Sequence, residues 1–203
     1  MSRAKARPIP FQPEMARALW EGRKTQTRRI VKPQSLFDGK DAIVRRHPNQ
    51  KGCPYGKPGD LLWVREAHHA YHWDRPRVVY RADHGGEPVR VRTQIESYEI
   101  GRWTPSIHMP RWASRMTLEL TEVRVELVRD INGEDAKAEG VAPAFEDDFG
   151  VVHSQPRYRW GFRKLWQSIN GPESWKADPW VWVLVFTVHK QNVDALPATH
   201  TGG

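Results

Sequence analysis

A lysine and a threonine lie three residues apart in the stretch "GRKTQTRR", which covers residues 22–29. The amine of Lys24 can act as a base if burial or neighbouring cations lower its pKa, and the three arginines of the stretch supply such cations. The hydroxyl of Thr27 becomes a nucleophile when such a base accepts its proton. The residue types therefore predict a Lys–Thr dyad, comparable in logic to the Ser–Lys pairs of known hydrolases.

The backbone decides whether this chemistry is possible. Positions 24 and 27 of a regular strand point to opposite faces, so the dyad requires the chain to turn, which Gly22 permits. Glu139 is expected in the last turn of a helix, where the negative helix end costs a carboxylate about 0.3–1 kcal/mol and raises its pKa. Such a group is suited to donating a proton to a leaving group. The alternative, an ordinary exposed helix glutamate, is the one that the residue types alone favour.

Other reactive groups give weaker signals. In "HHAYH", residues 68–72, an extended chain places His68 and His72 on one face and His69 on the other, whereas zinc usually needs three converging ligands. Cys53 is the only cysteine, which excludes an internal disulfide and a cysteine-based zinc cluster. The chain has neither a G-x-S-x-G elbow nor a phosphate-binding glycine loop. No metal and no organic cofactor are expected.

The elements that must position these residues follow from periodicity and helix punctuation. Pro13 fits the first turn of a short helix that ends before Gly22, and residues 24–31 are expected to be extended. Capping residues and charges predict a helix at 130–140. Apolar patterns predict a strand at 61–64 and a strand at 180–188 that is apolar on both faces. They also predict a helix at 157–171 with Phe162, Leu165, Trp166 and Ile169 on one face.

The segment 116–128 alternates between apolar and polar residues, but the parity changes after Leu120. Such a slip requires a β-bulge or a bend, which is common where sheets curl into barrels. Short strands, bends and a few helices predict an α+β fold, with a small curled β-sheet or barrel and short peripheral helices. The remaining expectations are a hairpin around 83–87, an ordered loop at 101–115, an irregular acidic loop at 142–156, an extended lead-in at 1–10 and a flexible tail at 190–203.

Composition points to a polyanionic partner. The 203 residues carry a net charge of +8 and ten tryptophans, and Arg–Trp pairs at 102–103, 111–112 and 159–160 suit base stacking beside phosphate contacts. A basic surface with ordinary Arg–Trp packing is the alternative. No apolar segment follows Met1, and the longest apolar run, 180–188, is too short to span a bilayer, so we expect a cytoplasmic protein.

At the residues of the dyad, the sequence resembles the ASCH domain family of the PUA-like β-barrel group. Its G-x-K-x-x-E-x-R signature corresponds to residues 22–29, and further similarity lies in "GKPGDLLWVRE", in "MTLELTEVRVELVRDINGEDAKAEG" and in "WVWVLVFTV". The resemblance implies a single PUA-like domain over residues 11–189, with insertions near 67–115 and 142–156. The chain is also similar to ASCH proteins encoded by phages and prophages.

One departure from the signature suggests an activity. Thr27 stands at the signature's acidic position, as it does in the small bacterial ASCH amidohydrolases that remove acetyl from N4-acetylcytidine. The resemblance implies that Lys24 is the proton acceptor, Thr27 the nucleophile and Glu139 the proton donor, with no cofactor. Arg29 would hold the ligand or stabilise the oxyanion, and further contacts to the nucleoside are expected from Tyr55, Trp63, Arg65, Trp103, His108 and Arg111.

Three alternatives to the amidohydrolase remain. PUA-like domains include non-catalytic RNA or DNA readers, which the positive charge and the Arg–Trp pairs favour. A ribonuclease activity is attributed to some ASCH proteins, and an interaction role in phage particles is implied only by the label that some relatives carry. The acyl group, the choice between free nucleoside and polymer, and the oligomeric state stay open.

Overall fold

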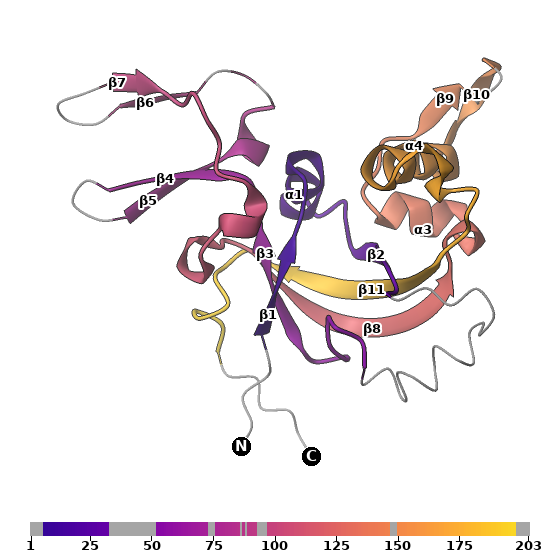
Figure 1. Cartoon of the computed structure of the whole chain (residues 1–203), viewed down its shortest axis with the longest axis horizontal. Coiled ribbons are helices and arrows are strands. Elements are labelled where there is room, and N and C mark those ends of the chain that lie inside the picture. Colours follow the sequence, from indigo (N-terminus) through magenta and orange to yellow (C-terminus); the bar gives the residue numbers. More distant parts are fainter. Residues whose placement is uncertain are drawn as a thin grey trace.

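The computed structural model of the chain describes residues 6–32, 52–72, 76–85, 87, 89–92, 97–146 and 150–197. Its centre is a curved sheet of five strands in the order β1-β3-β8-β11-β2 (Figure 1). The strands are β1 (Ala6–Pro10), β2 (Gln26–Ile30), β3 (Leu61–Arg65), β8 (Thr117–Leu127) and β11 (Trp180–His189). β1 pairs with β3 in parallel and the other pairs are antiparallel.

The expected α+β class is confirmed. Within the described residues, β1 and β2 are the edges of an open row of strands, so the closed PUA-like barrel stays an expectation. The lead-in at 1–10 was expected to be extended, and its described part, residues 6–10, is the edge strand β1.

The change of parity in β8 is a β-bulge. Opposite β11, Val185 pairs with Glu122 whereas Phe186 pairs with Leu120, so Thr121 is the extra residue. The bulge lets both registers bury their apolar side chains in one core, with Leu120 and Val123 1% and 4% exposed. The sequence-based prediction of a slip is thereby confirmed.

In the part of the chain that the structure describes, α-helices pack against the sheet (Figure 1). They are α1 (Pro13–Trp20), α3 (Gly133–Ala138) and α4 (Tyr158–Asn170). Short 3-10 turns connect the elements, namely η2 (Arg81–Asp83), η3 (Ser106–His108), η4 (Arg111–Ala113), η5 (Val128–Asp130) and η6 (Pro172–Ser174). The sequence-based helices at 13–20, 130–140 and 157–171 are all present, although α3 is shorter than its predicted range.

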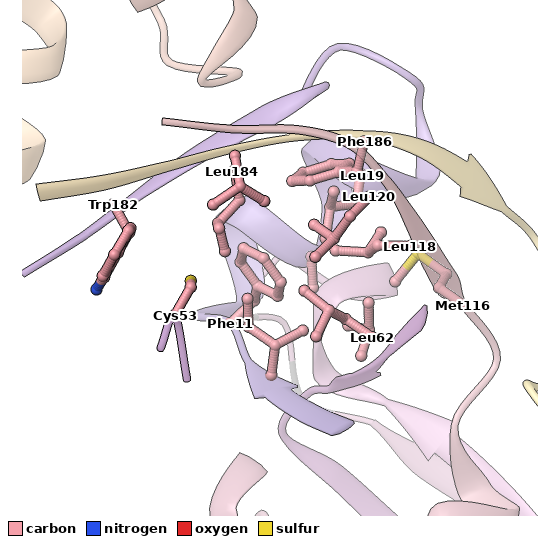
Figure 2. Close-up of a cluster of buried hydrophobic side chains, with 14 of the residues drawn as sticks. Phe11, Leu19, Cys53, Leu62, Met116, Leu118, Leu120, Trp182, Leu184 and Phe186 are labelled. Atoms are coloured by element: carbon pink, nitrogen blue, oxygen red, sulfur yellow. The ribbon is translucent and has the colours of Figure 1, made fainter. Parts of the chain in front are cut away.

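Two apolar cores lie on opposite faces of the sheet. The first contains Trp182, Leu184 and Phe186 of β11, with side chains from α1 and β3 (Figure 2). The second contains Val181 and Val183 of the same strand, packed with side chains of α3 and α4. β11 is therefore covered on both faces, as its continuous apolar run predicts.

The described residues of 67–115, the segment expected to be an insertion, form an arm that projects from the sheet (Figure 1). β4 (His68–His72) pairs with β5 (Pro76–Tyr80), and β6 (Arg90–Arg92) pairs with β7 (Ser97–Glu99). The predicted hairpin around 83–87 is wrong, because β5 continues into the helical turn η2 and each strand pairs with another neighbour. A small separate core, centred on Val89, Val91 and Ile100, holds the two hairpins together.

The last two sequence-based expectations also need revision. Where an irregular loop was expected, β9 (Ala144–Glu146) and β10 (Val152–Arg157) form a short antiparallel hairpin. The expected tail begins with an attached segment, since the Asn192 side chain donates to the carbonyls of Arg111 and Ser114 at 2.8 and 2.7 Å. Residues 198–203 lie outside the described residues. No helix in the described part of the chain is long and apolar enough to cross a membrane.

Candidate functional site

The chain turns between α1 and β2, where the Lys–Thr dyad was predicted. Gly22 has φ +78°, and the amides of both Arg23 and Lys24 donate to the carbonyl of Ala18, at 2.9 and 3.1 Å. Lys24 then forms an isolated bridge to Glu139, so regular strand β2 begins only at Gln26. Lys24 therefore lies outside the regular alternation of β2, so that alternation does not decide how Lys24 lies relative to Thr27; both residues line the same cavity.

Lys24 and Glu139 form a buried pair. The Lys24 ammonium donates to a carboxylate oxygen of Glu139 at 2.8 Å and to its backbone carbonyl at 2.8 Å. The two side chains are 2% and 4% exposed. Burial lowers the pKa of Lys24, the nearby Glu139 opposes this effect, and the Arg29 and Arg28 charges lower the pKa further.

Gly140 lets α3 come close enough to Lys24 for this pair. It follows Glu139, the C-cap of α3, and it has φ +78°. A Cβ at position 140 would lie 2.7 Å from the Lys24 Cβ and 2.9 Å from the Ala18 Cβ. A glycine is therefore required here both for the left-handed turn and for the approach of the two segments.

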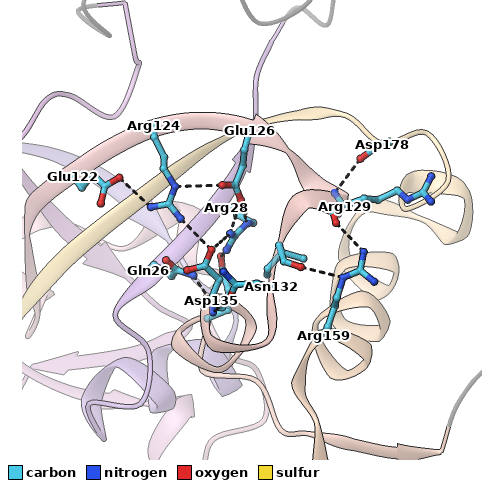
Figure 3. A network of polar contacts seen from close by, with 12 residues as sticks. Gln26, Arg28, Glu122, Arg124, Glu126, Arg129, Asn132, Asp135, Arg159 and Asp178 are labelled. Atoms are coloured by element: carbon cyan, nitrogen blue, oxygen red, sulfur yellow. Dashed lines mark hydrogen bonds and ion pairs between the residues drawn. The ribbon is translucent and has the colours of Figure 1, made fainter.

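A network of charges surrounds Arg28 (Figure 3). The buried Arg28 guanidinium donates to the second carboxylate oxygen of Glu139 at 3.0 Å, to Asp135 at 3.0 Å and to Glu126 at 2.8 Å. Arg124 adds contacts to Glu126 and Asp135 at 3.3 and 3.2 Å. Both oxygens of Glu139 thus have a cationic partner, which fixes the orientation of the carboxylate.

Thr27 and Arg29 alternate with Arg28 and therefore lie on the other face of β2. Thr27 is 4% exposed, and its hydroxyl has no hydrogen-bond partner among the described residues. Arg29 lies over the Phe11 ring at 4.9 Å and donates to the Pro10 carbonyl at 2.7 Å, while its buried Nε has no hydrogen-bond partner. Burial lowers the pKa of Arg29. Thr27 and Arg29 are thus left with free polar atoms.

These side chains meet at one cavity of about 740 Å³. Its polar lining includes Lys24, Thr27, Arg29, Tyr55 and Glu139. Residues of η3 in the arm and an apolar face of α4 also line it. A cavity of this size, lined by apolar residues and a few polar groups, is typical of a small-molecule site.

The open edge of β2 also borders the cavity. The Val31 amide donates to the Trp180 carbonyl at 3.0 Å and the Phe186 amide to the Thr25 carbonyl at 3.0 Å. In an antiparallel ladder with this register, the odd-numbered residues of β2 bond to β11 and the even-numbered ones direct their backbone groups outward. The amide of Arg28, which follows Thr27 in the chain, is therefore available to a ligand.

We compared the chain with protein-family models, with curated proteins and with solved structures. Nothing matched in any of the three searches. A function for this site therefore rests on its residues and their geometry.

The structure brings together five of the predicted site residues and separates the others. Lys24, Thr27, Glu139, Arg29 and Tyr55 line the cavity. Trp63, Arg65, Trp103, His108 and Arg111 do not line the cavity. The Arg65 guanidinium lies 4.7 Å from the centre of the buried Trp63 ring, and Trp103 packs in the small core of the arm beside the His84 ring. His108 is exposed at the end of η3, and Arg111 pairs with Asp194 at 2.7 Å.

The sequence-based prediction also missed residues that line the cavity. Phe11, Ile107 and four residues of α4, namely Phe162, Leu165, Trp166 and Ile169, were not assigned to the site. The α4 residues were identified by their helical spacing, but that spacing is the same for a helix that faces a core and for one that faces a cavity.

The histidines at 68–72 are not arranged as a metal site in the part of the chain that the structure describes. The Nδ1 atom of His68 lies 3.3 Å from the Glu66 carbonyl, and the Nε2 atom of His69 lies 3.3 Å from the Tyr98 hydroxyl. Three or more potential metal ligands do not converge anywhere among the described residues.

Proposed function

We propose that this chain is an ASCH-type, PUA-like amidohydrolase that removes the acyl group from an N4-acylated cytosine nucleoside or base. The observation that carries the proposal is the buried Lys24–Glu139 pair beside Thr27 in one cavity. The resemblance of residues 22–29 to the ASCH signature and the threonine at its acidic position also support it.

The Lys24–Glu139 pair can hold one proton in two places. The ion pair and the neutral pair contain the same number of protons and differ by a single transfer across a hydrogen bond of 2.8 Å. Burial disfavours the charged lysine, as the lowered pKa of Lys24 indicates. In the neutral pair, Lys24 is a free amine that can accept a proton and Glu139 is an acid that can donate one.

The reaction follows from this arrangement. The Thr27 hydroxyl oxygen attacks the acyl carbon while Lys24 takes the hydroxyl proton, and the carbonyl electrons move to the oxygen. The oxyanion then collapses, the bond between the acyl carbon and N4 breaks, and Glu139 protonates the departing N4. This step leaves a free cytosine amine and an acyl ester on Thr27.

Water completes the cycle. Glu139, now a carboxylate, takes a proton from a water molecule that attacks the ester carbon. The ester bond breaks, Lys24 returns its proton to the Thr27 oxygen, and the acyl group leaves as a carboxylic acid. The proton inventory of the site is then the same as at the start.

Two groups are placed to stabilise the oxyanion. The Arg28 amide lies at the open edge of β2 directly after Thr27, which is the position of an oxyanion-hole amide relative to its nucleophile in other acyl-transfer sites. The Arg29 guanidinium adds a positive charge on the same face of β2 as Thr27, and Arg29 lines the cavity.

A non-catalytic RNA or DNA reader is the second candidate. Lys32 and Arg81 are exposed cations that line the cavity, and neither has an ion-pair partner among the described residues. Such cations would suit phosphates on either side of a bound base.

Incubation with N4-acetylcytidine and with labelled single-stranded RNA separates these functions. We expect deacylation by the wild type and a loss of at least about 10³-fold in Lys24→Ala and in Thr27→Ala. The exposed residues Lys57 and Thr187 provide matched controls as Lys57→Ala and Thr187→Ala, which should retain activity. An intact nucleoside with salt-sensitive RNA retention would instead identify a reader, and cleaved RNA a ribonuclease.

A further inference from the structure

One face of α4 lines the cavity with large apolar side chains. Phe162, Leu165, Trp166 and Ile169 follow the i, i+3, i+4, i+7 spacing of a single helix face. The face extends along roughly 10 Å of helix. Phe162 and Trp166 are buried at its inner end, whereas Ile169 is 48% exposed at its outer end.

A second apolar group reaches the same cavity from the arm. Ile107, in η3, is 59% exposed and lines the cavity together with Pro105. Ile107 and Ile169 are thus two of the most exposed large apolar residues in the described part of the chain, and both border this space although they lie 62 positions apart in the sequence. Exposed apolar side chains gathered at a cavity mark a contact surface for a ligand.

The cavity has far more room than an acetyl group needs. Its volume of about 740 Å³ corresponds to roughly 25 water molecules in the liquid. An acetyl group ends one methyl beyond the carbon that Thr27 attacks, so it fills little of this volume and leaves Leu165 and Ile169, the less buried residues of the α4 face, uncovered. A longer acyl chain would cover that face while its carbonyl stays beside Thr27.

We propose that the acyl group removed at this site is larger than acetyl, a medium-length apolar chain that packs on the α4 face and beneath Ile107. This inference rests on the proposed amidohydrolase activity and names its substrate class. The bonds made and broken are those described for the acetyl case, and the product is the corresponding apolar carboxylic acid.

The test compares N4-hexanoylcytidine with N4-acetylcytidine. Each buried methylene contributes about fourfold in affinity, so for four partly buried methylenes we expect kcat/KM to favour the hexanoyl substrate by at least about tenfold. In Ile107→Ser and Ile169→Ser the ratio of the two kcat/KM values should fall by about threefold or more. Val152→Ser, which changes a residue that is 76% exposed and does not line the cavity, should leave the ratio unchanged.

A binding experiment without turnover separates this inference from the proposed function. Calorimetry with Thr27→Ala should give tighter binding of the hexanoyl than of the acetyl nucleoside, again by about tenfold. Hydrolysis of the acetyl substrate with an equal or poorer hexanoyl substrate would overturn the inference and leave the amidohydrolase standing. If neither substrate is hydrolysed by the wild type, the proposed function fails, and the inference fails with it.

Discussion

Among the described residues, two glutamates are deeply buried, and of this pair only Glu139 lines the cavity. Glu139 is 3% exposed and Glu66 is 1% exposed. Each is held by an arginine, since Arg28 donates to Glu139 at 3.0 Å and Arg115 donates to Glu66 at 2.9 and 3.0 Å. By burial and ion pairing alone, the two sites are alike.

They differ in the second partner and in the space around it. Glu139 also pairs with Lys24, whose pKa is lowered by burial and which lines the cavity. Arg115 holds Glu66 and Asp83 together, its pKa is raised, and it lies over the Tyr80 and Trp20 rings at 3.9 and 4.7 Å. A lysine can give up its proton when it is buried, whereas an arginine stays charged.

The Glu66 cluster fastens the arm to the body of the molecule. Asp83 belongs to η2, and the neighbouring Ala82 carbonyl accepts from Arg17 of α1 at 2.6 Å. The Tyr80 hydroxyl donates to the Ala113 carbonyl at 2.9 Å, and burial raises the pKa of Tyr80 to about 12. A buried ion pair is thus a structural anchor unless it contains a releasable proton and faces space for a ligand.

The largest expected effect comes from a substitution that keeps the charge at position 24. Lys24→Arg cannot supply a free amine, so we expect kcat/KM for an N4-acylcytidine to fall by at least about 10³-fold. Arg115→Lys, the matched exchange at the other site, should keep kcat/KM within a few-fold of the wild type. Lys24→Met also lacks the amine but has a smaller side chain than arginine, so an equal loss of kcat/KM in both variants excludes a steric cause. Substantial turnover by Lys24→Arg would exclude the proposed base.

Stability should rank the two sites in the opposite order from activity, with the larger loss at the Glu66 site. Arg115→Met leaves Glu66 buried without its cation, and we expect a loss of about 3–5 kcal/mol in the free energy of unfolding. Lys24→Met leaves Glu139 paired with Arg28, so its loss should be smaller, roughly 1–3 kcal/mol. Urea titrations followed by circular dichroism measure both values. An unchanged unfolding midpoint for Arg115→Met would show that the cluster is not an anchor.

The sequence alone predicts one of these two sites and not the other. The Lys24–Thr27 spacing can be recognised because both residues lie in one short stretch, and Gly22 signals the turn that it needs. The Glu66 cluster depends on residues 17 to 49 positions apart, and no local pattern links them. The same distinction holds for the fold. The β8 bulge can be predicted from the change in the alternation of apolar and polar residues along that strand, whereas no such pattern predicts the pairing of β5 with β4.

The composition was a less reliable guide to the ligand contacts. Trp103 and Arg111 were expected to contact the ligand because Arg–Trp neighbours suit stacking on a base, and Trp63 was expected to stack on the base as well. In the structure these rings and cations contact each other, the arm core or Asp194. An Arg–Trp pair has the same appearance in the sequence whether its partner is a base or another side chain.

A smaller effect on activity is expected at Arg28, the arginine that pairs with Glu139. Arg28 does not contact a reacting atom through its side chain, so Arg28→Lys should act through the orientation of Glu139. We expect kcat to fall by about tenfold with little change in KM, together with a shift of the pH–rate profile. Glu126→Gln, which loosens Arg28, should produce a smaller change in the same direction. Arg129→Gln, an exposed arginine beside the network, is the control and should leave the profile unchanged (Figure 3). A change in KM alone would assign Arg28 to ligand binding.

The smallest expected effect is a pair of opposite pH dependences. Burial lowers the pKa of Lys24 in the folded protein below 10.5, the value expected in the unfolded chain. Between the folded and the unfolded pKa, the unfolded chain binds more protons, so Lys24 makes the wild type more stable as pH rises. Burial raises the pKa of Glu66 above 4.5, so in that window the native chain binds more protons. The contribution of Glu66 is present below pH 4.5 and is lost as pH rises through its folded pKa.

Each pH dependence is isolated by subtracting the free energy of unfolding of a variant from that of the wild type. The free energy of unfolding of the wild type minus that of Lys24→Met should increase with pH on the alkaline side, towards 10.5. The corresponding difference for Glu66→Gln should decrease with pH on the acidic side, above 4.5. Urea titrations at closely spaced pH values give both slopes. Two slopes of the same sign would mean that the two sites hold their protons in the same way, and the contrast between a catalytic pair and an anchor would lose its physical basis.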